Sequence, residues 1–589
     1  MEKKNDKIGI YVCNCGTNIA KVVDAEAVAQ YASMLPNVSL AKTYKYMCSN
    51  PGQEMIAEDI KENGLDRVVV AACSPNMHER TFRGALRMAG LNQYMLEMAN
   101  IREQCSWVHK DRKAATEKAM ALVNGAVQRV QKHEALESMT VDMNPSVLVI
   151  GGGIAGMTTA LELADAGNFV HLVEKDDHLG GNLARVDLTA PYYYSASDLL
   201  TERITRTRQH KNIQVYLNSK LTELSGFVGN FAAKIKHLNG EPESSAKVKE
   251  VAIGNVAIGT GYKEFDASRI THYGYGKLPN VITSFELERM LKEGRIETKE
   301  GKIPKYIAII HCVGSRNKEF HTYCSRVCCM TALKYAHEIK SANPECYVSD
   351  VYIDMHAFGK GHEDFYRQSS QAKTLFLMYD KENRPIIHKA GPKDDCDMLI
   401  EVHERLSGEH IEIPADLVVL MVGMEAREDS HEIAHLTNIS QDKDGWFIES
   451  HPKLEPVATT TDGVFIAGTC VAPKDIPDTV AQARAAAARI LARISKGKIE
   501  VDAVFAEVNE DVCSGCRICN VMCPYSAIEF DEEQKKSHVI SALCKACGVC
   551  VAACPSGAIK GRHFTDEQVL AQIEGIFSDV EYTEVPITM

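Results

Sequence analysis

The chain has 589 residues, more than one compact core normally contains, so about three or four domains are expected. Its 45% hydrophobic and 25% charged residues are typical of a globular protein and exclude wholesale disorder. A net charge of -13 argues against non-specific binding of nucleic acid. No apolar run reaches the roughly 18 residues of a membrane helix, and the start lacks a secretion signal. We therefore expect a soluble cytoplasmic protein that does not span a membrane.

Cysteine is the most informative residue type, because most of the 20 cysteines are clustered. Five lie within residues 13–105, four within 312–329 and eight within 513–554. In a reducing compartment, clusters of this kind indicate metal ligands or redox groups rather than disulfides. The scattered cysteines are Cys346, Cys396 and Cys470.

Residues 1–140 alternate strand-like and helix-like segments, which predicts an α/β domain with a parallel sheet and helices on its faces. A long helix is expected from Asp111 to about Gln131. The expected strands are residues 8–13, 39–47, 67–73 and 93–101.

Five cysteines of this N-terminal domain are placed near the ends of its predicted strands. Cys13, Cys48 and Cys73 fall at carboxyl ends, and Cys105 lies just after the fourth strand. In a parallel sheet these ends share one edge, where ligands gather. We predict a [4Fe–4S] cluster bound by four of the five, with Cys15 as the spare. The alternative is a thiol-rich docking domain without metal.

The strongest motif lies in residues 503–562, where the pattern C-x2-C-x2-C-x3-C-P occurs twice. This spacing wraps three thiolates around one face of a cubane cluster, and the fourth cysteine of each run ligates the other cluster. A zinc site is the alternative, but zinc does not need two interlocked runs. We predict a bacterial-type 2[4Fe–4S] ferredoxin domain, followed by an acidic tail over residues 563–589. One cluster is assigned to Cys513, Cys516, Cys519 and Cys554, and the other to Cys544, Cys547, Cys550 and Cys523.

Residues 145–497 are predicted to form a doubly wound α/β domain that binds a dinucleotide. A buried strand, a G-x-G-x-x-G turn and a helix follow one another from residue 146. The three glycines permit the tight turn, the approach of the backbone to a pyrophosphate and close helix packing. Glu174 ends the next strand, where its carboxylate can accept the ribose hydroxyls. The motif alone is compatible with FAD or NAD.

Further segments favour FAD over a nicotinamide-only domain. A GGN segment follows Glu174 closely, as in flavoproteins with two dinucleotide domains. Two later glycine-containing segments resemble the strand that returns the chain to the FAD domain and the late flavin-binding strand. No element is placed in the polar residues 190–250. The predicted FAD site comprises Gly151, Gly153, Gly156, Glu174, Lys175, Gly181, Asn182, Gly261 and Gly468.

The middle cysteines occupy the place of a second glycine-rich turn. There the chain reads HCVGSR, and no CxxC pair occurs between 145 and 500, which disfavours NAD(P)H oxidation and disulfide exchange. One cysteine ends a strand and three lie at a turn or helix start, with Cys324 and Cys328 expected on one helical face. An iron–sulfur cluster is predicted, with buried structural thiols as the alternative. Its expected ligands are Cys312, Cys324, Cys328 and Cys329.

Lys334 follows the middle cysteines closely. We hypothesise that it lies near the flavin and stabilises a reduced anion, and thus has a catalytic role. The alternative is a lysine on the solvated surface.

The segments HCVGSR, YCSRVCC, DMHAFGKGHEDFY and PKDIPDTVAQA, together with the N-terminal IGIYVCNCG and VVVAACSPNMHERTFR, closely resemble the A subunits of heterodisulfide reductases. The resemblance covers nearly the whole chain. It implies a thioredoxin-reductase-like FAD domain with a [4Fe–4S] cluster bound by the four middle cysteines near the FAD. Two departures stand out. Many members insert a second ferredoxin module, whereas residues 190–250 contain no cysteine, and DLTAPYYYSAS replaces a stretch that often contains cysteine.

By this resemblance, the protein is an FAD and iron–sulfur oxidoreductase subunit that performs flavin-based electron bifurcation between a high-potential disulfide-type acceptor and low-potential ferredoxin. The implied partners are heterodisulfide-reductase-like B and C subunits or a related iron–sulfur module, a hydrogenase or formate dehydrogenase type donor, and ferredoxin. A homodimer within a larger complex is also implied. The alternatives are a non-bifurcating adapter, as in quinone-coupled complexes, and a stand-alone pyridine-nucleotide oxidoreductase.

Overall fold

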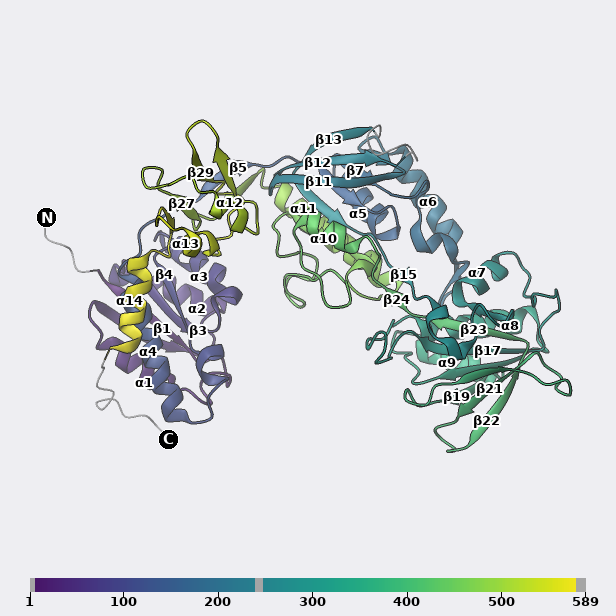
Figure 1. The fold of residues 1–589 in the computed structure, drawn as a ribbon. Helices are drawn as coiled ribbons and strands as arrows, with labels where there is room; N and C mark the ends of the chain where they lie inside the picture. Colours follow the sequence, from purple (N-terminus) through teal and green to yellow (C-terminus); the bar gives the residue numbers. More distant parts are fainter. Residues whose placement is uncertain (1–5, 239–246, 579–589) are drawn as a thin grey trace. The chain divides into compact units, whose positions relative to one another are not determined.

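The computed structural model describes residues 6–238 and 247–578, and the chain divides into two compact units (Figure 1). The first unit combines residues 1–140 with residues 500–589. The second unit contains residues 141–499.

A parallel sheet with strand order β2-β1-β3-β4 lies at the centre of the N-terminal region of the first unit. β1 is buried along its whole length, and its alternate side chains enter two hydrophobic clusters. This confirms the predicted parallel sheet. The strands are β1 (Ile8–Cys13), β2 (Val38–Tyr44), β3 (Arg67–Ala72) and β4 (Leu96–Asn100). The helices are α1 (Ala25–Ser33), α2 (Asn50–Asn63), α3 (Pro75–Ala89) and α4 (Arg112–Val130).

The long helix expected after these strands is α4. Asp111 caps its first turn by accepting a hydrogen bond from the Ala114 amide. A short π-helix, η1 (Arg102–Ser106), connects β4 to this helix. The position and length of α4 agree with the prediction.

The cysteine-rich region of the first unit repeats one short motif. Each half contains a short helix followed by a strand, and antiparallel strand pairs connect the halves. Its elements are β27 (Ala506–Val508), α12 (Ile518–Met522), β28 (Ile528–Asp531), β29 (Lys536–Val539), α13 (Val549–Ala553) and β30 (Ile559–Gly561).

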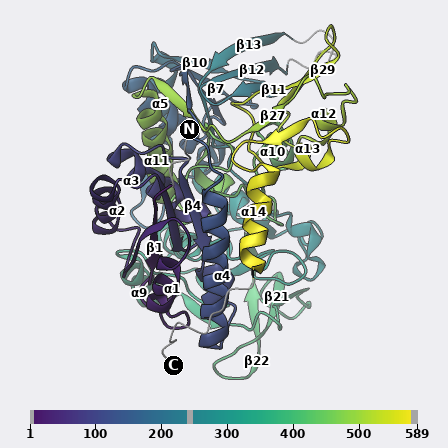
Figure 2. The same ribbon diagram turned by 90° about the vertical axis from the view of Figure 1, so that its left-hand side faces the viewer.

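Helix α14 (Asp566–Phe577) occupies part of the segment that was expected to be an acidic tail. A capping box formed by Thr565 and Gln568 begins the helix. α14 packs against α4, alongside which it runs in Figure 2. The two helices meet at a pair of glycines: a Cβ atom on Gly575 would lie 2.8 Å from the Cα of Gly125. Glycine is therefore required where these helices cross.

The first half of the second unit is built on a parallel sheet with strand order β10-β7-β6-β14-β25. An antiparallel sheet, β11-β12-β13, lies between β10 and β14 in the chain. The main strands are β6 (Val147–Ile150), β7 (Val170–Val173), β10 (Ile213–Tyr216), β11 (Ser219–Phe227), β12 (Asn230–His237), β13 (Val248–Ile253), β14 (Asn255–Ile258) and β25 (Val464–Ile466). The helices are α5 (Ile154–Asp165), α6 (Ala196–Gln209) and α11 (Ile476–Ile494).

The second half of this unit has the same combination of sheets as the first. Its parallel sheet has the order β16-β23-β17-β18-β19, and its antiparallel sheet is β20-β21-β22. The doubly wound architecture is as predicted. Its strands are β16 (Val281–Thr283), β17 (Tyr306–Val313), β18 (Tyr347–Tyr352), β19 (Leu375–Met378), β20 (Ile386–Lys389), β21 (Met398–His403), β22 (His410–Ala415) and β23 (Leu417–Val422). Its helices are α7 (Ser284–Lys292), α8 (Cys328–Ala342) and α9 (His362–Gln371), and α10 (Ser430–Thr437) follows.

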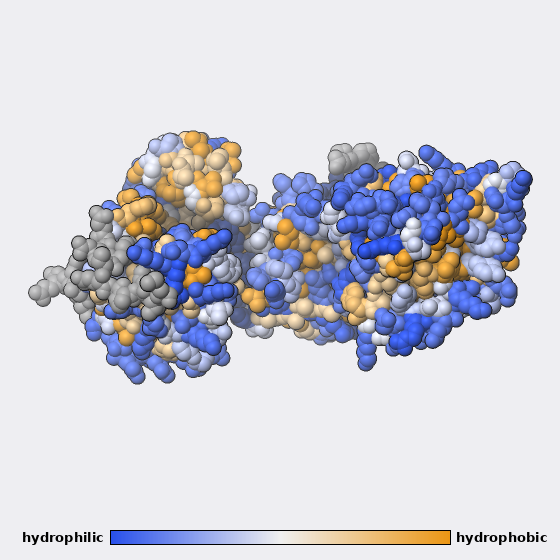
Figure 3. All heavy atoms as spheres, turned by 90° about the horizontal axis from the view of Figure 1, so that it is seen from below, coloured by the Kyte–Doolittle hydropathy of each residue, from blue (hydrophilic) through white to orange (hydrophobic). Residues whose placement is uncertain are grey.

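The surface seen in Figure 3 is largely hydrophilic, with apolar residues interspersed. Within the described residues, no helix combines the length and apolar character needed to cross a membrane.

The glycine pair between α4 and α14 generates a prediction for stability. Gly575→Ala should destabilise the first unit by about 1–3 kcal/mol, because the added methyl group meets the backbone of α4. Thermal unfolding of the full chain, with limited proteolysis of α14, measures the effect. Gly84→Ala in α3 is the matched control, because a Cβ there meets no atom within 4 Å. Equal unfolding temperatures for both variants would contradict the prediction.

Candidate functional site

A cavity of about 660 Å³ lies within the second unit, at the carboxyl ends of strands from both of its parallel sheets. Most of the predicted flavin residues line it: Gly151, Gly153, Glu174, Lys175, Gly181, Asn182 and Gly261. The other two, Gly156 and Gly468, lie outside its lining and shape the backbone next to it.

Glycine is needed at the turn after β6 because the backbone is crowded. Gly151 has a φ of 104°, and a Cβ atom on Gly156 would lie 1.8 Å from the carbonyl oxygen of Gly151. Gly153 and Gly181 face each other across the opening, where a Cβ on Gly181 would lie 3.2 Å from the Cα of Gly153. The two loops therefore form a cradle of bare backbone at the N-terminus of α5, which suits a pyrophosphate.

Glu174 directly follows β7 and is 8% exposed. Its carboxylate accepts hydrogen bonds from the amides of Gly152, at 2.6 Å, and Asp176, at 2.9 Å. These bonds hold the carboxylate at the cavity wall, in the place expected for ribose recognition. Lys175, which follows it, pairs with Asp429 at 2.6 Å, and both line the cavity.

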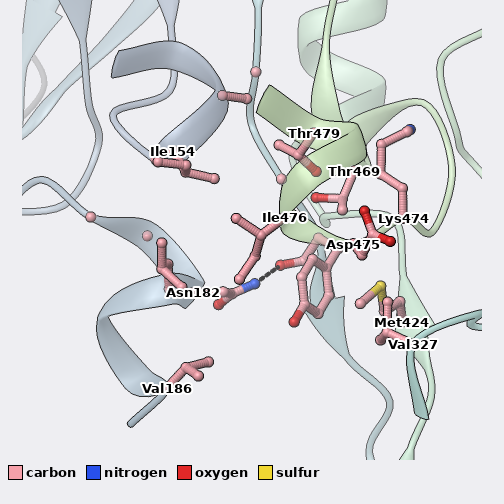
Figure 4. Close-up of a pocket in the computed structure, with 18 of the residues that line it drawn as sticks. Ile154, Asn182, Val186, Val327, Met424, Thr469, Lys474, Asp475, Ile476 and Thr479 are labelled. Atoms are coloured by element: carbon pink, nitrogen blue, oxygen red, sulfur yellow. Dashed lines mark hydrogen bonds between the residues drawn. The ribbon is translucent and has the colours of Figure 1, made fainter. Parts of the chain in front are cut away.

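The far wall of the cavity is the N-terminus of α11. Asp475 caps this helix by accepting from the Asp478 amide, and Ile476 and Thr479 face Asn182 across the opening (Figure 4). Asn182 donates to the carbonyl of Tyr262 at 2.8 Å. The α11 terminus was not among the predicted site residues, although an aspartate followed by proline two residues later signals a helix start.

Lys334 is buried and lines the cavity, so it is not a surface lysine. Its ammonium group donates to Glu288 at 2.5 Å and to the carbonyl of Leu188 at 2.9 Å, and Glu338 lies 3.5 Å away. Burial raises the pKa of Glu338 to about 7, against the opposing effect of Lys334 and with a further rise from Glu288. Neither carboxylate was predicted as a site residue, because neither belongs to a recognisable motif.

The middle cysteines gather beside this cavity. Cys312 lies near the end of β17 with a φ of 58°, Cys328 and Cys329 begin α8, and Cys328 itself lines the cavity. Burial raises the pKa of Cys328 far above its usual value, and the thiols of Cys312, Cys329 and Cys324 add to the rise. The thiols of these three cysteines therefore lie close enough to Cys328 to affect its ionisation. One expectation was wrong: Cys324 lies in the loop before α8, so it does not share a helical face with Cys328.

Four N-terminal cysteines come together at the carboxyl edge of the N-terminal sheet. Cys13 ends β1, and its pKa is raised by burial and by the thiols of Cys15 and Cys48. Burial also raises the pKa of Cys73 to about 11, with Cys15 and Cys13 among the groups around it. Arg102 donates to the Cys15 sulfur at 3.5 Å.

Cys105 is separated in the structure from the other three predicted ligands. It is fully buried in the hydrophobic cluster that contains Ile8 and Val12, whereas Cys13 and Cys73 belong to the cluster on the opposite face of the sheet. Cys15, the residue expected to be a spare, lies beside the other three and packs against both clusters. Its φ of 46° turns the chain there after β1.

The cysteine-rich region brings together sulfurs from both of its motifs. Cys519 and Cys550 lie in the two short helices and are buried, whereas Cys516 and Cys547 are exposed. A small cavity is lined by one predicted ligand set, which combines the fourth cysteine of the first motif with three of the second: Cys523, Cys544, Cys547 and Cys550. The remaining set is Cys513, Cys516, Cys519 and Cys554.

Two family models match parts of the chain. Residues 149–198 match an NAD(P)-binding Rossmann-like domain, and residues 512–558 match a 4Fe-4S dicluster domain. Among solved structures, the chain resembles thioredoxin reductase of T. acidophilum, with 16% identity, a TM-score of 0.39, and coverage of 60% of this chain and 99% of that one. For thioredoxin reductase of Lactococcus lactis the identity is 17%, the TM-score is 0.40, and the same fractions are covered.

Curated relatives match over nearly the full length. The first of two iron-sulfur A subunits of CoB--CoM heterodisulfide reductase in Methanopyrus kandleri is 40% identical, over 98% of both chains. The A subunit of the H(2):CoB-CoM heterodisulfide,ferredoxin reductase of Methanothermobacter thermautotrophicus is 40% identical, over 98% of this chain and 99% of its own. These matches show that the chain belongs to the family of heterodisulfide reductase A subunits, as an oxidoreductase component with FAD and [4Fe–4S] clusters as its cofactors.

Proposed function

We propose that this flavin and iron–sulfur electron-transfer subunit performs electron bifurcation: an electron pair is collected at the flavin site and its electrons leave along separate paths. The main support for the proposal is that Cys328 lines the 660 Å³ cavity that contains most of the predicted flavin residues. The thiols of three further cysteines lie near Cys328. A one-electron cluster bound there would border a two-electron cofactor. When bound, FAD supplies the exchange between two-electron and one-electron chemistry.

The residues of the chain orient this cofactor and tune the charge around it. The bare backbone at Gly153 and Gly181 would hold the pyrophosphate, and Glu174 would hold the ribose. The N-terminus of α11 places positive electrostatic potential at the cavity wall, which favours negative charge in the cavity. The ammonium group of Lys334 adds a positive charge there, which its ion pair with Glu288 offsets in part.

The assignment of cysteines to clusters is part of the proposal. We assign one cluster to Cys312, Cys324, Cys328 and Cys329. A second is assigned to Cys13, Cys15, Cys48 and Cys73. The two ferredoxin-type clusters keep the ligands expected from the repeated motif, and the Cys523 cavity supports that crossed assignment.

The names of relatives support the choice of partners. The Methanothermobacter thermautotrophicus relative is named for H(2), heterodisulfide and ferredoxin, and that of Methanococcus maripaludis also for formate. For this chain we propose B- and C-type subunits or a related iron–sulfur module, a hydrogenase or formate dehydrogenase donor, and ferredoxin. A homodimer within that complex is part of the same proposal.

A non-bifurcating adapter is the second candidate, and one observation favours it. The alignment with the Methanopyrus kandleri relative spans 668 positions, more than the 589 residues of this chain, so that relative contains segments without a counterpart here. If those segments carry one of the electron paths, this chain transfers electrons between its partner subunits without separating an electron pair.

An anaerobic redox titration of the full chain separates the two candidates. Bifurcation predicts that the flavin absorbance falls in a single two-electron step, while cluster EPR signals appear at separate potentials. Two well-separated one-electron steps of the flavin would support the adapter and contradict bifurcation.

Replacing Lys334 should lower the flavin midpoint potential. In Lys334→Met the buried positive charge is lost, so reduced anionic flavin is less stable, and we expect a drop of at least about 30 mV, or about 1.4 kcal/mol for a two-electron couple. Lys340→Met, on the same helix and outside the cavity lining, is the control. Because the single variant leaves Glu288 buried and unpaired, the Lys334→Met/Glu288→Gln double variant is titrated as well. Unchanged potentials in both would refute the role.

The proposed N-terminal ligand set predicts opposite outcomes for two cysteines. Cys15→Ser should remove about four iron atoms per chain, one [4Fe–4S] cluster, whereas Cys105→Ser should leave the iron content unchanged. Iron analysis and EPR of the reduced full chain measure this. Loss of iron in the Cys105 variant alone would favour the ligand set that includes Cys105.

A further inference from the structure

A third cluster of side chains with metal-binding atoms lies in the first unit and contains no cysteine. It consists of Glu97 on β4, His133 just after α4, and His563 between β30 and α14. One ligand atom from each residue lies within 4.8 Å of the others. All three residues are buried, with His133 2% and His563 6% exposed.

The two histidines lack the hydrogen bonds that buried imidazoles normally make. Neither ring nitrogen of His133, nor Nδ1 of His563, has a hydrogen-bond partner among the described residues. Leaving a buried polar group unsatisfied costs about 1–3 kcal/mol, so such groups need an explanation. The ring centroids lie 4.1 Å apart, which brings the unpartnered nitrogens into one small space. An ion between them would supply the missing interactions.

The one measured separation between two of the ligand atoms fits a first-row metal. His133 Nε2 lies 3.3 Å from Glu97 Oε2, too loosely aligned for a hydrogen bond but close to the separation of two ligands in a tetrahedral shell with bonds of about 2.0–2.1 Å. Two imidazole nitrogens and one carboxylate oxygen are a ligand set typical of zinc, and a fourth position remains for water. The small number of oxygen ligands disfavours calcium and magnesium.

The groups around the cluster include a donor that orients Glu97 and two arginines whose charges oppose a bound cation. The other carboxylate oxygen of Glu97 lies 3.4 Å from Arg129, which also donates to the backbone carbonyl of His563 at 3.0 Å. A ligating carboxylate that also accepts from a neighbouring donor is a common arrangement, because the second bond orients it. Arg129 therefore steadies Glu97, although its charge, like that of the nearby Arg83, opposes a cation.

We propose that Glu97, His133 and His563 bind one divalent transition-metal ion, with zinc the best match, and thereby fasten the segment after the ferredoxin-like region to the N-terminal sheet. His563 lies in the segment that leads into α14, and α14 packs against α4 (Figure 2). The proposed role of the ion is structural. It does not depend on the proposed bifurcation.

The test uses the full chain with its iron–sulfur clusters and flavin loaded. After incubation with Zn²⁺ and removal of loosely held metal, mass spectrometry should find about one zinc ion per chain. His133→Gln and His563→Gln should each weaken zinc binding about tenfold or more, because glutamine keeps the volume but not the ligand strength. His538→Gln, in the first unit outside the cluster, should bind zinc like the parent. Iron and flavin contents should stay constant in all of them.

A second measurement uses the parent chain, so its main result does not depend on a variant folding. Hydrogen exchange of α14 in the parent chain should slow when Zn²⁺ is added. In folded His563→Gln the added Zn²⁺ should give no such protection. Absence of bound zinc in the parent chain would overturn the proposal. Zinc retained equally by both cluster variants would also overturn it, because the metal would then lie elsewhere.

Discussion

The parallel β-strand is the constraint on which the sites of this protein depend. Parallel strands end at one edge of a sheet, and the chain must turn there before it enters a helix. In the N-terminal sheet the turns after β1 and β3 bring Cys13, Cys15 and Cys73 together. In the second unit the turns after β6 and β7 provide the glycine cradle and Glu174, and the end of β17 carries Cys312. Three sheets thus place candidate cofactor-binding residues at the same structural position.

Buried charge is paired in both units. Lys334 is buried together with Glu288 and Glu338, and these three residues set the electrostatics of the cavity wall. Glu97 lies between Arg129 and His133 in the first unit. Taking a single charge out of water costs several kcal/mol, so each of these groups requires its partners. The same requirement makes such clusters sensitive to substitution and suitable for tuning a cofactor or holding an ion.

Several features could be predicted because their signals are local. The glycine turn, the repeated cysteine motif and the helix that begins after Asp111 each depend on residues close together in the chain, and the structure places them as expected. The elements between residues 190 and 250 were missed because their apolar faces are narrow. Helix α6 buries only Ala196, Leu200 and Thr207, so its sequence is mostly polar. Helix α14 was missed for a related reason, since its apolar contacts depend on α4 being present.

Periodicity and short motifs were enough to predict the alternation of strands and helices, the cofactor classes and the spacing of the cluster ligands, because each of these depends on neighbouring residues. The fold was needed to show that Cys15 rather than Cys105 lies beside the other N-terminal thiols. Cys15 lies in a turn with positive φ after β1, whereas Cys105 is buried on the opposite face of the sheet from Cys13 and Cys73. The fold also shows that Lys334 is buried with two carboxylates and that Glu97, His133 and His563 meet. These groupings join residues from distant parts of the chain, and folding alone brings such residues within bonding distance.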